Sequence, residues 1–159
     1  MCEIEQRLLA AGLSLPPPLK VSAGTRLPFP AARRYGQRLL ISGHGPQQAS
    51  GEIQTLGKLG EDLDVEQGYQ AARLVALSML GSIKRELGSL DRVTQWVRVF
   101  GMVNSSATFC DHPSVINGFS DLIIQLYGET RGMHVRSAVG MAQLPFNIPV
   151  EVEAEVEWR

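Results

Sequence analysis

The chain has 159 residues, of which 44% are hydrophobic, and its formal net charge at pH 7 is −1. This length and apolar fraction suit a single globular domain with an adequate core. The charge balance gives no basic field of the kind that sequence-independent nucleic-acid binding requires, so nucleic acid is not an expected partner. An acidic N-terminus and the lack of a long apolar run argue against a signal peptide or a membrane span, so we expect a cytoplasmic protein.

The N-terminal residues 1–18 are expected to form an appendage to one domain spanning residues 19–159. Residues 3–12 carry apolar side chains at helical spacing and predict a short helix that Gly12 ends. The prolines at residues 16–18 cannot continue a helix or enter a central strand, so this run should be extended. Cys2 and Cys110, the two cysteines, favour free thiols over a disulfide framework.

Two strand-like runs follow the appendage, at residues 20–23 and 38–42, with a turn at residues 35–37 before the second run. The second run is the better strand. The polar, glycine-punctuated segment 47–60 predicts a loop that contains a weak strand or turn.

Two long amphipathic helices are predicted on either side of a strand. Asp64 suits the N-cap of the first helix, and Gly88 suits its end. Residues 93–103 have the β-branched and aromatic density of a central strand. The second helix is predicted over residues 113–127, with Gly128 as its stop.

The clearest strand signal lies at the end of the chain, in residues 150–158. Valine, alanine and tryptophan occupy every second position there, and four glutamates occupy the positions between them. A strand that begins near Arg136 precedes it, and a proline-containing turn joins the two. A row of glutamates on one face requires solvent or basic partners.

This order of elements predicts an α+β fold with two layers, in which two long helices cover one face of a mixed sheet of about six strands. Two helices cannot cover both faces of such a sheet. The other face is therefore either polar and solvated or an oligomer interface, and we favour the interface.

Residue chemistry by itself does not identify a reaction. His44, His112 and His134 lack clustered partners at metal-ligand spacing, so no metal is expected. The Ser-Gly-His-Gly-Pro segment at residues 42–46 is interpreted as a turn, with His44 facing solvent. By themselves, Arg136 and Glu151 could be ordinary surface charges.

The segment Val135-Arg-Ser-Ala-Val-Gly-Met-Ala-Gln-Leu-Pro145, followed by Val150-Glu-Val-Glu-Ala154, resembles the C-terminal signature of the Rid/YjgF family. These proteins are reactive intermediate deaminases, also called endoribonuclease L-PSP. Further matching positions extend the resemblance over most of the chain from about Leu39. Residues 62–73, 115–122 and 131–140 are similar to those of a less-studied subgroup of the family that has longer chains. The additional matches are Ile41-Ser-Gly-His-Gly-Pro46, Asp91-Arg-Val, Phe109 and Asn117.

The resemblance implies a chorismate-mutase-like fold and homotrimers whose sheets pack into a central barrel, with ligand clefts between subunits. The arginine that binds the substrate carboxylate in the family corresponds to Arg136, and the glutamate that holds the attacking water corresponds to Glu151. The backbone groups that complete the pocket correspond to Ser42, Gly43 and Ala138.

Three further positions bear on substrate preference. Phe29 stands where many members have a tyrosine, and His44 replaces the usual glutamine after Ser-Gly. His44 either faces solvent, which we favour, or restores a polar contact in the cleft. Asn117 is expected to fix a helix face or a wall of the cleft. Residues 110–113, an insertion relative to short members, should alter the rim of the cleft.

The implied activity is hydrolysis of 2-imino or 2-enamino acids to 2-oxo acids and ammonia. A guanidinium binds a carboxylate through two parallel hydrogen bonds and fixes the neighbouring imine carbon, while one carboxylate relays the proton of the attacking water. This chemistry requires no cofactor. Two alternatives stay open: a binding module for small carboxylates without catalysis, and an endoribonuclease, which the acidic last strand disfavours.

Overall fold

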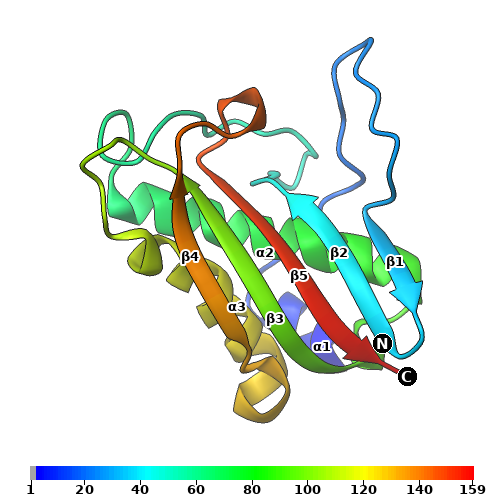
Figure 1. Ribbon diagram of the computed structural model, residues 1–159. Helices are drawn as coiled ribbons and strands as arrows, with labels where there is room; N and C mark the ends of the chain where they lie inside the picture. The colour runs from blue at the N-terminus through cyan, green and yellow to red at the C-terminus, as the bar shows by residue number, and fades with distance from the viewer. Residues whose placement is uncertain (1–2) are drawn as a thin grey trace.

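The computed structural model describes residues 3–159, which pack as two layers (Figure 1). One layer is a sheet, and the other contains the long helices α2 (Val65–Leu87) and α3 (His112–Gly132) with the short helix α1 (Glu3–Ala10). Within the described residues, all three helices lie on the same side of the sheet, and the opposite face carries no helix. The predicted α+β architecture with one open sheet face is therefore confirmed.

The sheet has five strands in the order β1-β2-β5-β3-β4. These strands are β1 (Ala32–Tyr35), β2 (Arg38–His44), β3 (Val93–Asn104), β4 (Val135–Met141) and β5 (Val150–Trp158). Pairing is antiparallel except between β3 and β4, which are parallel, so the sheet is mixed. The sheet therefore has five strands, whereas the sequence predicted about six.

The predicted strand at residues 20–23 is wrong, because residues 18–31 form an irregular arm that rises beyond the end of the sheet (Figure 1). We call residues 18–31 the arm. The actual partner of β2 is β1, where Tyr35 pairs with Arg38 across a tight turn at Gly36. Gly36 has a φ of 58°, which glycine adopts without steric cost.

The two C-terminal strands are not neighbours in the sheet. Residues 145–147, which form the 3₁₀ turn η2 (Pro145–Asn147), carry the chain from β4 past the end of β3 to β5. β3 therefore lies between β4, which carries Arg136, and β5, which carries Glu151.

Helix α2 begins and ends as the sequence predicts. The Asp64 side chain accepts from the Gln67 backbone N–H at 2.8 Å, and the Gln67 side chain accepts from the Asp64 N–H at 2.9 Å, forming a capping box. Gly88 ends the helix at a φ of 83°. Gly128 interrupts the helical geometry of α3 as expected, but α3 resumes and continues to Gly132.

The alternating sequence of β5 places its valines in the core and its glutamates on the opposite face of the sheet. Val150, Val152 and Val156 are fully buried beneath the helices, whereas the glutamates lie on the open face of the sheet. Arg38 on β2 supplies one of the cations that this face requires, with its Nη1 2.7 Å from Glu155 Oε1.

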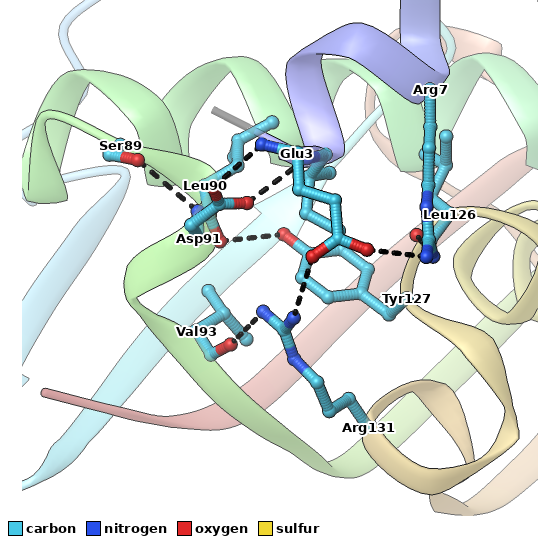
Figure 2. A network of polar contacts seen from close by, with 10 residues as sticks. Glu3, Arg7, Ser89, Leu90, Asp91, Val93, Leu126, Tyr127 and Arg131 are labelled. Atoms are coloured by element: carbon cyan, nitrogen blue, oxygen red, sulfur yellow. Dashed lines mark hydrogen bonds and ion pairs between the residues drawn. The ribbon is translucent and has the colours of Figure 1, made fainter. Parts of the chain in front are cut away.

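Helix α1 is tied to the body of the domain by polar contacts (Figure 2). The Asp91 carboxylate accepts from the backbone N–H groups of Glu3 at 2.7 Å and Ile4 at 3.0 Å, which satisfies two donors at the start of the helix. Arg7 donates to the Leu126 carbonyl at 2.6 Å. Ile4 is fully buried, so α1 contributes to the core.

Candidate functional site

A cavity of about 320 Å³ lies where β2 ends and β5 begins, between the arm and η2. The predicted site residues that line this cavity are Phe29, Ser42, Gly43 and Glu151, and His44 lines it with them. The remaining walls are largely apolar and come from the arm, from the residues around η2 and from residues 45–53, while α2 contributes the polar Ser82 and Arg85.

Glu151 and Gly43 are in direct contact in this cavity. The register between β2 and β5 shifts between Ile41 and His44, and this irregularity brings Gly43 against the Glu151 carboxylate. A Cβ atom at position 43 would overlap that carboxylate, so a larger residue there would have to displace the Glu151 side chain. Burial raises the pKa of Glu151, and the negative charge of Glu153 raises it further.

Ser42 connects β2 to the arm. Its hydroxyl donates to the Pro30 carbonyl at 2.8 Å, and its backbone N–H donates to the Ala31 carbonyl at 3.0 Å. These bonds hold the adjacent Phe29 at the cavity wall, where its side chain is 55% exposed.

His44 does not face solvent, contrary to the sequence prediction, and is only 8% exposed. Its Nδ1–H donates to the Ser42 carbonyl at 2.6 Å, which leaves Nε2 to accept from the Ser82 hydroxyl at 2.8 Å. Burial lowers the pKa of His44, so the ring is neutral. The sequence does contain a feature that could have predicted this contact: Ser78 and Ser82 interrupt the apolar face of α2, where they are buried.

Arg136 belongs to a second group of residues, between β4 and α3. Its Nη1 donates to Ser120 Oγ at 2.9 Å, and its Nη2 donates to Asn117 Oδ1 at 2.7 Å and to the Pro113 carbonyl at 3.2 Å. Burial lowers the pKa of Arg136, while Asp121 opposes that effect. None of the ion pairs formed within residues 3–159 includes Arg136.

Ser120 was missed by the sequence analysis, because a small polar residue inside an apolar helix gives no distinctive signal. It links Arg136 to His134, whose Nε2 lies 2.9 Å from Ser120 Oγ and whose Nδ1–H donates to the Gly132 carbonyl at 2.7 Å. Ala138 follows Arg136 by two residues on the same side of β4 and packs against the core.

The two groups lie on opposite faces of the sheet in one chain. Arg136 pairs in register with Val99, which is fully buried beneath the helices. Glu151 pairs with Met102 on the alternate face of β3. One chain therefore brings Phe29, Ser42, Gly43 and Glu151 together, and separately brings Asn117, Arg136 and Ala138 together.

Other functional features are few in the part of the chain that the structure describes. Within residues 3–159 no group of three histidine, cysteine or acidic residues is placed to hold a metal ion. No helix in that range is long and apolar enough to cross a membrane. Cys110 is a free, exposed thiol, whereas Cys2 lies outside the described residues.

The fold and the cavity define a two-layer α+β domain with a site of small-molecule size. A family model described as "YjgF/chorismate mutase-like, putative endoribonuclease" matches residues 5–154. The chain therefore belongs to this family.

Individual relatives agree with that assignment. Protein TCP17 of Trypanosoma cruzi is 46% identical over 122 residues, which is 77% of this chain and 76% of the relative. The structure of Atu1372 from Agrobacterium tumefaciens, a protein of unknown function, is 38% identical with a TM-score of 0.87, covering 98% of this chain and 92% of that one. A Shewanella oneidensis protein described as a "putative endoribonuclease" is 32% identical with a TM-score of 0.88, covering 98% and 99% of the two chains.

Proposed function

We propose that this protein is a cofactor-independent hydrolase that converts 2-imino and 2-enamino acids into 2-oxo acids and ammonia. The observation that carries the proposal is the environment of Arg136. Three neutral acceptors on α3 hold its guanidinium, and no carboxylate of the described residues forms an ion pair with it. A guanidinium has five N–H donors, so donors remain for the carboxylate of a substrate.

Glu151 is the proposed base, and it reaches the substrate held by Arg136 of a second copy. Opposite faces of one sheet cannot contact the same small molecule, but Arg136 lies on the edge strand β4, so a copy that packs against the open face and extends past this edge can bring its Glu151 close to Arg136. The open face supports such an interface, because Val135 is 70% exposed and Leu40 is 46% exposed there. A homotrimer packed through its open sheet faces is the assembly that we propose.

The reaction requires positioning and proton transfer. The Glu151 carboxylate accepts a proton from water as the water oxygen bonds to C2 of the imine, and it then returns this proton to the nitrogen, which gives a neutral carbinolamine and regenerates the carboxylate. Glu151 next passes the carbinolamine hydroxyl proton to the nitrogen, so that ammonia leaves as the C–N bond breaks and the C2 carbonyl forms. A raised pKa makes ionised Glu151 a stronger base than an exposed carboxylate, which favours the first step.

The direct test feeds the protein with aminoacrylate released by a serine dehydratase and follows pyruvate and ammonia. Purified protein should accelerate their release over buffer, and Arg136→Ala and Glu151→Gln should each remove the acceleration. Glu157→Gln is the matched control, because Glu157 is an exposed glutamate on the same strand that does not line the cavity. Lack of acceleration by the wild-type protein with every imine tested would refute the proposal.

A binding module for small carboxylates is the second candidate, because Arg136 can bind an anion whether or not Glu151 acts as a base. Calorimetry would then detect 2-oxobutanoate binding that Arg136→Ala abolishes, without any hydrolysis. The description of the Shewanella relative also warrants an RNA degradation assay with Arg136→Ala as its control.

A further inference from the structure

Phe146 combines two unfavourable features beside the cavity that contains Glu151. Its side chain is 65% exposed, and its backbone has a φ of 58°, a left-handed conformation that is costly for a bulky residue. Asn147 follows with a φ of 59°. Strained residues that the surrounding structure holds in place are concentrated at ligand-binding sites.

The backbone around Phe146 is held by several contacts. The Asn147 carbonyl accepts from the Gly57 N–H at 2.9 Å, and Asn104 Nδ2 donates to Asn147 Oδ1 at 3.1 Å and to the Ile148 carbonyl at 3.2 Å. Asn104 is 1% exposed, so this anchor is part of the protein interior. The Phe146 side chain is therefore presented at the cavity by a fixed turn.

The arm supplies a second apolar wall to the same cavity. Leu27 is 43% exposed and Phe29 is 55% exposed, and both line the cavity together with Phe146 and Ile148. Polar groups of the lining are largely engaged. The Gln47 amide donates to the Gly51 carbonyl at 3.2 Å and to the Pro17 carbonyl at 3.4 Å, and the Arg85 guanidinium donates to Ser82 Oγ at 2.9 Å and to the Pro16 carbonyl at 3.2 Å. The arm and the residues around η2 can therefore bind a ligand mainly through apolar contacts.

We infer that Phe146 and Phe29 bind a large apolar substrate side chain, so that the preferred substrates are 2-imino acids with branched aliphatic or aromatic side chains. This inference rests on the proposed function, since Glu151 in the same cavity fixes where C2 of the substrate lies. A side chain extending from C2 then runs between the arm and η2. Phe146 and Phe29 are specificity-determining residues, with no part in proton transfer.

The test compares 2-oxo acids that differ only in their side chains, with binding measured by calorimetry on the full chain. Wild-type protein should bind 4-methyl-2-oxopentanoate about tenfold more tightly than pyruvate, because the additional carbons become buried. Phe146→Ala should reduce that ratio to about threefold or less, with pyruvate binding unchanged. Tyr35→Ala is the control, because Tyr35 is 76% exposed on the far turn between β1 and β2.

Phe146→Gly separates a binding role from a structural one. Glycine adopts the same φ without strain, so this variant should unfold at no lower temperature than wild type while losing the preference for the larger acid. A clear loss of stability with the preference retained would overturn the inference. A second ligand pair, 2-oxohexanoate and 2-oxoadipate, has chains of equal length and differs by a carboxylate in place of the terminal methyl group. Tighter binding of 2-oxoadipate would also overturn the inference.

Hydrolysis of the corresponding imines, generated by an amino-acid oxidase, distinguishes this inference from the proposed function. Acceleration with equal rates for small and large imines, together with equal binding of the two 2-oxo acids, would leave the proposed function intact and refute the side-chain preference. A preference in binding without acceleration of any imine would refute the proposed reaction and support the apolar pocket.

Discussion

Mixing two inactive variants provides the sharpest test of a site shared between copies. Arg136→Ala removes the proposed carboxylate-binding group, and Glu151→Gln removes the proposed base. Charge-assisted hydrogen bonds contribute about 1.5–3 kcal/mol each, so losing the Arg136 contacts should lower kcat/KM by about tenfold to more than a hundredfold. Because the two side chains lie on opposite faces of one sheet, a working site would take one residue from each of two copies.

Random exchange of the two variant chains between assemblies determines how much of the enzymatic rate should return. The two variants are denatured together in equal amounts and refolded. At each interface, the chain that supplies position 151 and the chain that supplies position 136 are then chosen independently and at random. About one quarter of the interfaces then combine an intact Glu151 with an intact Arg136, so about one quarter of the wild-type rate of pyruvate release should return.

A second mixture controls for exchange itself. Compared with an equal total amount of wild-type protein, an equal mixture of wild-type protein and the double variant should show about one quarter of the rate if sites are shared, and about one half if each chain carries a complete site. A variant mixture that stays as inactive as its components, although the second mixture proves exchange, would refute the shared site.

Three other changes follow from individual contacts. Gly43→Ala should displace the Glu151 carboxylate and lower kcat/KM while the protein stays folded, which enzyme assays and thermal unfolding would show together; an unchanged kcat/KM would contradict the role of this contact. The rate should fall as pH decreases through the raised pKa of Glu151, and Glu153→Gln should move this fall to lower pH, because it removes a charge that raises that pKa; a pH profile that does not shift would contradict the assignment. Asp91→Ala should lower the free energy of unfolding by about 1–2 kcal/mol in urea titrations, because the N–H groups at the start of α1 lose their acceptors; an unchanged value would mean that α1 docks without this cap.

Local signals in the sequence predicted the parts of the fold that local contacts determine. Asp64 and Gly88 were identified as the boundaries of α2 because a capping box and a left-handed glycine involve only neighbouring residues. The alternation in β5 was equally readable, since each valine of that strand meets the same buried layer of helices.

Strand pairing was less predictable, because it depends on residues far apart in the chain. β1 has the sequence Ala-Arg-Arg-Tyr, and with Arg33 and Arg34 exposed it lacks the apolar alternation of a half-buried strand. The positions of Arg136 and Glu151 on opposite faces follow from the register of β4 and β5 against β3. A shift of one residue in either register would reverse the face, and sequence alone does not set that register.

The environment of Arg136, the proposed carboxylate-binding residue, depends on its contact with Ser120, which could not be predicted from the sequence. Burial lowers the pKa of His134, so its neutral ring accepts from Ser120, whose oxygen then accepts from Arg136. The same order of groups recurs between α2 and β2, where Arg85 donates to Ser82 Oγ at 2.9 Å and the Ser82 hydroxyl donates to the neutral His44. A neutral hydroxyl fixes the orientation of the guanidinium without cancelling its charge, whereas an acidic residue at position 120 would neutralise it. Arg136 is therefore oriented by the protein and still available to an anion, as the proposed binding of a substrate carboxylate requires.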